Sequence, residues 1–159
     1  MDNKKKINKI FIFFFILFIV FSVAFIGSVF TSSSVKTEWY ESIKPGITPP
    51  NFIFVIVWNI LFFLISLSIY FSWISSNKNE KKIILIVYGI NFFLNILWTF
   101  IYFVLKNPLL SFFEIIFLFF SIIILIKVSY KINKVSSYLL IPYFLWIIFA
   151  SYLNFLSIK

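Results

Sequence analysis

Five long apolar runs follow one another along the chain and constrain its fold more than any other feature. They cover residues 10–30, 52–74, 83–105, 109–126 and 138–157. As a helix, each run is about long enough to cross a hydrocarbon core that is ~30 Å thick. Only 12% of the residues are charged, whereas soluble domains have about 25%. We therefore predict an all-α membrane protein in which residues 1–159 form a single domain, a bundle of five transmembrane helices.

The first run follows a cluster of lysines, as the apolar part of a signal peptide does. A signal peptide has an apolar core of about 7–15 residues, however, whereas this run has about 21 and no small-residue cleavage site after it. We expect the run to be retained as the first transmembrane helix.

The fourteen cationic residues are all lysines, and they are divided unevenly between the two ends of the predicted bundle. Ten lie at the N-terminal end, namely Lys4, Lys5, Lys6, Lys9, Lys78, Lys81, Lys82, Lys127, Lys131 and Lys134. Four lie at the other end, namely Lys36, Lys44, Lys106 and Lys159. Because lysine-rich segments face the cytoplasm, we predict a multi-pass protein of the cell membrane with a cytoplasmic N-terminus.

The segment between the first two runs, residues 31–50, is the only long connection in the chain. By the same charge rule it lies outside the cytoplasm. Its prolines, Pro45, Pro49 and Pro50, restrict the backbone and stiffen an otherwise long loop. We expect this loop to fold over the end of the bundle as an extracytoplasmic lid.

The residue types that the chain lacks exclude several classes of chemistry. Without cysteine or histidine it forms no disulfide, iron–sulfur cluster or Cys/His zinc site. The sequence also contains no recognisable nucleophile–base pair or group of metal ligands, so we expect no metal site, no required cofactor and no conventional enzyme chemistry. The net charge of +9 does not indicate nucleic-acid binding, because the lysines lie between apolar runs. The expected partner is membrane lipid.

Polar and amphipathic residues recur at helical spacing on two of the predicted helices. The third carries Tyr88, Asn91, Asn95, Trp98 and Tyr102, and the fifth carries Tyr143, Trp146, Ala150, Asn154 and Ser157. Each set falls on one narrow face and needs an interior to face. One interpretation is hydrogen bonding between helices. The other is a ligand cavity lined by aromatic rings and a few polar groups, and the two are compatible.

Two further residues within the spans are informative. Glu114 is the only acid in a span, and its position near the start of the fourth helix leaves a functional and an interfacial role open. Pro142, close to the start of the fifth span, removes a backbone donor, so it either kinks the helix and opens a groove or serves packing alone.

Three stretches resemble the signature of the TspO/MBR family, also known as tryptophan-rich sensory proteins or translocator proteins. The pattern W-Y-x-x-L-x-K-P-x-W-x-P-P…F-x-x-V-W is similar to Trp39-Tyr40, Lys44-Pro45, Pro49-Pro50, Phe54 and Val57-Trp58. The pattern A-L-N-x-x-W is similar to Leu94, Asn95 and Trp98, and P-Y-x-x-W-x-x-F-A-x-x-L-N to Pro142, Tyr143, Trp146, Phe149, Ala150, Leu153 and Asn154. The resemblance covers nearly the whole chain in order.

The chain departs from the family pattern at several positions. Ile47 stands where the loop tryptophan is common, Asn91 where glutamine is usual, and Val104 where a glycine follows the paired aromatics. The cholesterol motif of eukaryotic members requires a tyrosine after L-N, where this chain has Phe155. Cholesterol transport is therefore not supported.

The resemblance implies a homodimeric five-helix receptor or sensor whose pocket binds porphyrins, such as protoporphyrin IX or haem, and benzodiazepine-type ligands. Because histidine and cysteine are absent, we expect free-base porphyrin to bind at least as readily as haem. The residues implied for ligand binding are Trp39, Tyr40, Trp58, Asn95, Trp98, Tyr143, Trp146, Ala150 and Asn154.

Two other functions stay open beside that of a receptor. One is light-dependent degradation of porphyrin, reported among bacterial members of the family, for which Trp58 and Trp146 would be the catalytic residues. The other is a carrier for porphyrin or lipid, although neither an inverted repeat nor a pair of broken helices is visible in the sequence.

Overall fold

The computed structural model describes residues 2–158, with the side chains of residues 7–158, and over this range it contains helices and no strand. In chain order the helices are α1 (Asp2–Ser32), α2 (Glu38–Ile43), α3 (Asn51–Ser75), α4 (Lys78–Thr99), the π-helical segment η1 (Phe100–Val104), α5 (Pro108–Ile132), α6 (Lys134–Tyr138) and α7 (Ile141–Leu156). Five spans are long and apolar enough to cross a membrane. The prediction of an all-α membrane protein with five transmembrane helices is therefore confirmed. Lys159 and the side chains of Lys4, Lys5 and Lys6 lie outside the described part.

The helices run beyond the apolar runs from which they were predicted. The fourth run ends at residue 126, yet α5 continues to Ile132, because Ser129 is buried while Lys127 and Lys131 stay exposed on the same turns. Long lysine side chains tolerate such positions by directing their ammonium groups outward.

The fifth span is divided, where we predicted a single helix over residues 138–157. α6 ends at Tyr138, a turn follows at Leu139 and Leu140, and α7 begins at Ile141. Pro142 therefore lies in the first turn of α7, where its missing N–H removes no hydrogen bond, and it does not kink a continuous helix.

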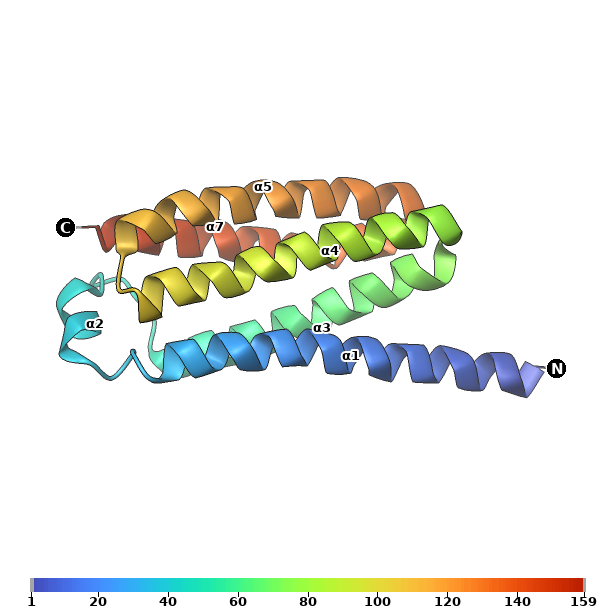
Figure 1. The fold of residues 1–159 in the computed structure, drawn as a ribbon, viewed down its shortest axis with the longest axis horizontal. Coiled ribbons are helices and arrows are strands. Elements are labelled where there is room, and N and C mark those ends of the chain that lie inside the picture. Colours follow the sequence, from blue (N-terminus) through green and yellow to red (C-terminus); the bar gives the residue numbers. More distant parts are fainter. Residues whose placement is uncertain (1, 159) are drawn as a thin grey trace.

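The long helices pack side by side as an antiparallel bundle (Figure 1). α5 packs between α4 and α7, and α1 packs mainly on α3. Figure 1 shows the N-terminus at the same end as the α3–α4 and α5–α6 turns, and α2 at the other end, near the C-terminus.

The surface of the bundle is apolar and its interior contains the polar groups. Phe11, Phe18 and Phe117 are among many large apolar side chains that are exposed, as expected for contact with lipid. Inside, an apolar core around Ile115, Leu118 and other α5 residues alternates with buried serines, asparagines and tyrosines.

Each polar residue of the α4 stripe bonds to another helix. At the end near the α3–α4 turn, the Tyr88 hydroxyl shares hydrogen bonds with Ser68 Oγ (2.8 Å) and Ser129 Oγ (3.1 Å). One turn further, Asn91 Nδ2 donates to Ser121 Oγ (2.8 Å). The interpretation of the stripe as interhelical hydrogen bonding is confirmed for these residues, which hold α4 to α3 and α5.

Candidate functional site

The lid is built on the short helix α2, which covers one end of the bundle (Figure 1). Thr37 caps this helix, its Oγ1 accepting from the backbone N–H of Tyr40 (3.4 Å). Ser34 Oγ donates to the carbonyl oxygen of Phe103 (2.8 Å), which ties the start of the lid to η1. The prolines of this segment predict a stiff loop, and the structure adds the short helix α2 within it.

Two aromatic residues of α2 hold the lid against the bundle. The Tyr40 side chain is only 6% exposed, and its ring packs against Phe103 with 6.0 Å between centroids. Trp39 meets Tyr102 edge to face at 6.0 Å, with Lys106 Nζ 5.8 Å from the centre of the indole. Burial raises the pKa of the Tyr40 phenol to about 12, and the nearby Tyr102 and Glu41 add to the rise.

A small cavity of about 50 Å³ lies under the lid, between α3, α4, η1 and α7. It is lined by Tyr40, Pro45 and Thr48 from the lid, Phe54 from α3, Trp98, Tyr102 and Phe103 from α4 and η1, and Ala150, Leu153, Asn154 and Ser157 from the end of α7. Aromatic rings therefore form much of its wall, with an amide and hydroxyl groups at its edge.

The π-helical segment η1 supplies two of these rings from adjacent positions. Ile101, Tyr102 and Phe103 are all buried, although neighbouring residues of an α-helix point about 100° apart. The wider turn of a π-helix, seen in the bond from Leu105 N–H to the carbonyl oxygen of Phe100 (3.0 Å), brings both rings toward the lid. The chain then reverses at Lys106, which has a φ of 52°.

Asn154 joins three helices at the floor of the cavity. Its Oδ1 accepts from Trp98 Nε1 (3.0 Å) and from Ser111 Oγ (3.1 Å), while its Nδ2 donates to the carbonyl oxygen of Pro108 (2.8 Å). Beside it, the Tyr102 hydroxyl donates to Ser157 Oγ (2.9 Å). These bonds fix the orientation of the Trp98 indole and the Tyr102 ring in the cavity wall.

Asn95 and Tyr143 lie deeper in the bundle and do not line the cavity. Asn95 Nδ2 donates to the Tyr143 hydroxyl (3.2 Å), which in turn donates to Asn91 Oδ1 (3.3 Å). Trp58 packs on this group, with its ring 6.3 Å from that of Tyr143 and stacked on Phe62 at 5.4 Å. The arrangement supports the packing of α3, α4 and α7 beneath the cavity.

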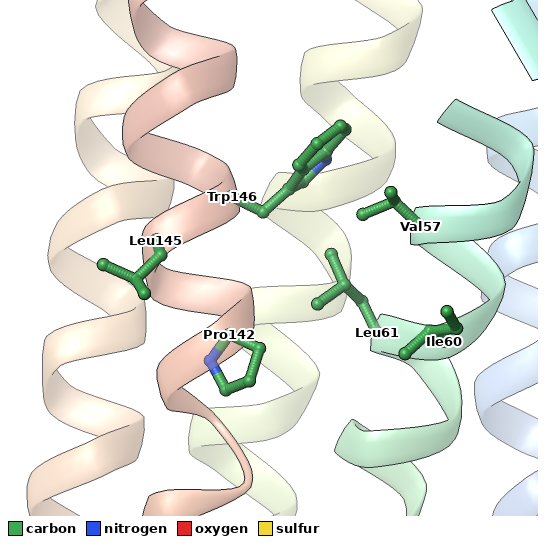
Figure 2. A pocket seen from close by; sticks show the side chains of 6 residues that line it. All are labelled: Val57, Ile60, Leu61, Pro142, Leu145 and Trp146. Atoms are coloured by element: carbon green, nitrogen blue, oxygen red, sulfur yellow. The ribbon is translucent and has the colours of Figure 1, made fainter. Parts of the chain in front are cut away.

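Trp146 lies in a groove on the outside of the bundle, between α3 and α7 (Figure 2). The groove encloses about 380 Å³ and is lined by Val57, Ile60, Leu61, Pro142, Leu145 and Trp146. Figure 2 shows the indole directed from α7 toward α3. The ring meets Phe54, which lines the cavity, edge to face at 5.5 Å, so one aromatic ring separates Trp146 from the cavity. Its Nε1–H is buried and has no hydrogen-bond partner within the described part of the chain.

Glu114 is buried in the second turn of α5. The side chain is 6% exposed, and neither carboxyl oxygen has a hydrogen-bond partner among the described residues. The carboxyl group therefore faces the interior of the bundle.

Of the nine residues implied for ligand binding, four line the cavity: Tyr40, Trp98, Ala150 and Asn154. Trp39 contacts the cavity wall through Tyr102, and Asn95 and Tyr143 lie below the cavity. Trp58 packs against Tyr143, and Trp146 lies in the outer groove. Seven further residues line the cavity that the family resemblance does not imply as ligand contacts: Pro45, Thr48, Phe54, Tyr102, Phe103, Leu153 and Ser157. Tyr102 and Ser157 belong to the two polar stripes, and Pro45, Phe54 and Leu153 belong to the family signature.

Comparisons with known proteins show the family of this chain. The sequence model of the TspO/MBR family matches residues 15–158. The tryptophan-rich protein TspO of Archaeoglobus fulgidus is 40% identical over 141 residues, which cover 86% of this chain and 88% of that protein. The tryptophan-rich protein TspO of Chlorobaculum tepidum is 32% identical, and the match covers 84% of this chain and 85% of that protein. The tryptophan-rich sensory protein of Cereibacter sphaeroides is 25% identical, and the match covers 90% of both proteins. The chain belongs to the TspO/MBR family.

Proposed function

We propose that this TspO/MBR membrane protein is a receptor or sensor that binds a porphyrin-like tetrapyrrole under its lid. The observation that carries the proposal is the cavity wall, in which Tyr40, Trp98, Tyr102 and Phe103 surround a space that the Asn154 amide borders. A flat macrocycle gains from stacking on such rings, and its polar edge gains from amide and hydroxyl groups.

Binding requires the lid to move, because the closed cavity of about 50 Å³ is far smaller than the roughly 300–1,000 Å³ of ordinary ligand pockets. The contacts that hold the lid are the Ser34–Phe103 hydrogen bond and the rings of Trp39 and Tyr40. Displacing α2 joins the cavity to the space above it. Lys106, which lies over Trp39 at the rim, then supplies a cation for the carboxylates of the ligand.

A substitution at Ala150 tests the location of the ligand. Ala150 is small and lies in the cavity wall, one turn before Asn154. Ala150→Thr adds two heavy atoms to this wall, and overpacking of this kind costs about 1–3 kcal/mol. We expect the affinity for free-base protoporphyrin to fall roughly 10- to 100-fold, measured by quenching of tryptophan fluorescence in the dark.

The matched control is Ala24→Thr, because Ala24 is the only other alanine of the chain and lies on α1, away from the cavity lining. The control should bind porphyrin like the parent. Unchanged affinity in a folded Ala150→Thr variant would remove Ala150 from the ligand site, and an equal loss in both variants would assign the effect to packing of the bundle.

A second candidate function is light-dependent porphyrin degradation. The observation that favours it is the contact of Trp146 with Phe54, which places an oxidisable indole one ring away from the cavity. Under this hypothesis Trp58→Phe and Trp146→Phe bind porphyrin in the dark but lose most of the light-dependent loss of its absorbance. Trp73→Phe, at the far end of α3, is the control. If the double variant bleaches porphyrin at the parent rate, Trp58 and Trp146 are not the reacting residues.

We also propose that benzodiazepine-type ligands occupy the same cavity and that the protein is a homodimer in the membrane. A shared site predicts mutual displacement of porphyrin and a benzodiazepine-type ligand in the fluorescence assay. One chain has a mass of 18.9 kDa. If the protein is a dimer, light scattering should give a protein mass of twice this value after the contribution of the detergent is subtracted. Simultaneous binding of both ligands, or a monomeric mass, would contradict the respective proposal.

A further inference from the structure

Six lysines lie at the end of the bundle opposite α2, on and beside the turns that join α3 to α4 and α5 to α6 (Figure 1). We call them the basic surface; they are Lys78, Lys81, Lys82, Lys127, Lys131 and Lys134. Lys81 is half-buried and the others are exposed. Glu80 is the only acidic residue on these turns. The surface therefore carries a strong excess of positive charge.

A hydrogen bond joins the two turns that carry these lysines. Asn133, between α5 and α6, donates from its Nδ2 to Ser75 Oγ at the end of α3 (3.0 Å). The same asparagine caps α6, its Oδ1 accepting from Val135 N–H (2.9 Å), and Asn77 caps α4 in the same way. Because these caps occupy amide groups at the helix starts, the lysine ammonium groups are the donors that remain for an anion.

No acidic side chain of residues 7–158 forms an ion pair with these ammonium groups. Among the side chains of residues 7–158, the ion pair that forms is Lys44–Glu41 in the lid, and Glu80 accepts instead from the backbone N–H of Asn77 (2.8 Å). Two lysines are held over aromatic rings, Lys81 Nζ 5.2 Å from the centre of Trp73 and Lys134 Nζ 5.6 Å from that of Tyr130. Such contacts hold an ammonium group in place while leaving its other side open.

Lipid-facing apolar residues begin directly beside these lysines. Ile83 follows Lys82, Val135 follows Lys134, and both are exposed, as are Ile74 and Tyr138. A soluble polyanion would meet the charges alone. A phospholipid with an anionic headgroup would meet the charges with its phosphate and the apolar surface with its acyl chains, so it complements both features.

We propose that the basic surface binds the headgroups of anionic phospholipids in the leaflet that it faces. The phosphate lies between the lysines of the two joined turns, and the acyl chains run along the apolar surface of the adjacent helices. This inference does not depend on the ligand of the lid cavity, because the two sites lie at opposite ends of the bundle.

The test is a lipid titration of the full-length protein by native mass spectrometry at low ionic strength, with phosphatidylglycerol and phosphatidylcholine of identical chains. The variant Lys78→Gln/Lys131→Gln/Lys134→Gln removes three charges, each worth about 1 kcal/mol near a membrane surface. We expect its affinity for phosphatidylglycerol to fall about a hundredfold, with little change for phosphatidylcholine. In each of the three single variants the affinity for phosphatidylglycerol should fall about fivefold. The single variants therefore test the proposal even if the triple variant is unstable.

The matched control, Lys36→Gln/Lys44→Gln/Lys106→Gln, removes three charges at the lid end and should keep the parent affinity for phosphatidylglycerol. Three results would overturn the proposal: equal losses in the two triple variants, equal affinity of the parent for both lipids, or displacement of phosphatidylglycerol by inorganic phosphate at the same concentration. The last result would assign the basic surface to a soluble anion.

Discussion

Replacing Asn154 by leucine should destabilise the bundle and the cavity wall together. The asparagine is 1% exposed and makes three hydrogen bonds, which join α7 to Trp98 of α4 and to Ser111 and Pro108 of α5. Leucine has a similar volume, so the change removes the hydrogen bonds without opening a large hole. The Trp98 indole N–H then loses its partner in the interior, whereas the Pro108 carbonyl oxygen still accepts from the Ser111 hydroxyl (2.9 Å).

The expected loss of stability follows from these contacts. Interhelical hydrogen bonds in membrane proteins average about 0.6 kcal/mol each, which gives about 2 kcal/mol for three. Leaving a buried polar group unsatisfied costs about 1–3 kcal/mol, so the total approaches about 3 kcal/mol where the indole N–H finds no new acceptor. Because the two estimates describe the same bonds, they bracket the effect and do not add.

The assay is the free energy of unfolding of the reconstituted protein, together with the fluorescence of Trp98, whose surroundings change when its partner is lost. Asn59→Leu is the matched control, since Asn59 is exposed on α3 and its amide bonds only to the carbonyl oxygen of Val55 on the same helix (2.7 Å). We expect no loss of stability in this control. Equal stabilities of the two variants would refute the role of Asn154 as a junction of three helices.

Three further predictions concern other parts of the molecule. Glu114→Leu should raise the melting temperature in detergent, because the carboxyl oxygens are buried with no hydrogen-bond partner among residues 7–158. A lower melting temperature would contradict this prediction and indicate a hydrogen-bonding role for the side chain. The protonated Tyr40 phenol favours the closed lid fully below about pH 10, and this contribution should disappear as the pH rises through the Tyr40 pKa of about 12. A cysteine introduced in the lid should therefore react faster with a thiol reagent as the pH rises over this range. Tyr40→Phe should abolish the part of this change that depends on Tyr40. In intact cells an impermeant maleimide should label a cysteine introduced at Ser33 but not one at Ser76, and the opposite result would reverse the topology.

The helices and the polar faces could be predicted because their signals are local in the sequence. An apolar run of about 20 residues predicts a span whatever surrounds it. The spacing of Asn91, Asn95 and Trp98 predicts a shared face, and in the structure each of these residues bonds to a neighbouring helix. Ala150 and Asn154 were placed in the site by the family resemblance, and both line the cavity.

The details that depend on packing could not be predicted. α2 has six residues, too few to produce a periodic pattern, and it is fixed by Thr37 and by burial of Tyr40. The π-helical turn at Tyr102 and Phe103 has no local signal, because it arises where α4 meets the reversal at Lys106. Trp58 and Trp146 lie on helices that border the cavity, yet Trp146 faces the outer groove between α3 and α7. Its direction depends on how these two helices pack, which the sequence does not show.

Binding of a porphyrin under the lid is tested by titrating the reconstituted protein with free-base protoporphyrin in the dark. Binding is followed by quenching of tryptophan fluorescence, for which Trp98 and Trp39 lie in or beside the cavity wall. We predict saturable quenching with one porphyrin per chain and a weaker affinity in Ala150→Thr than in Ala24→Thr. Quenching that rises linearly without saturation, and is identical in the two variants, would contradict the account.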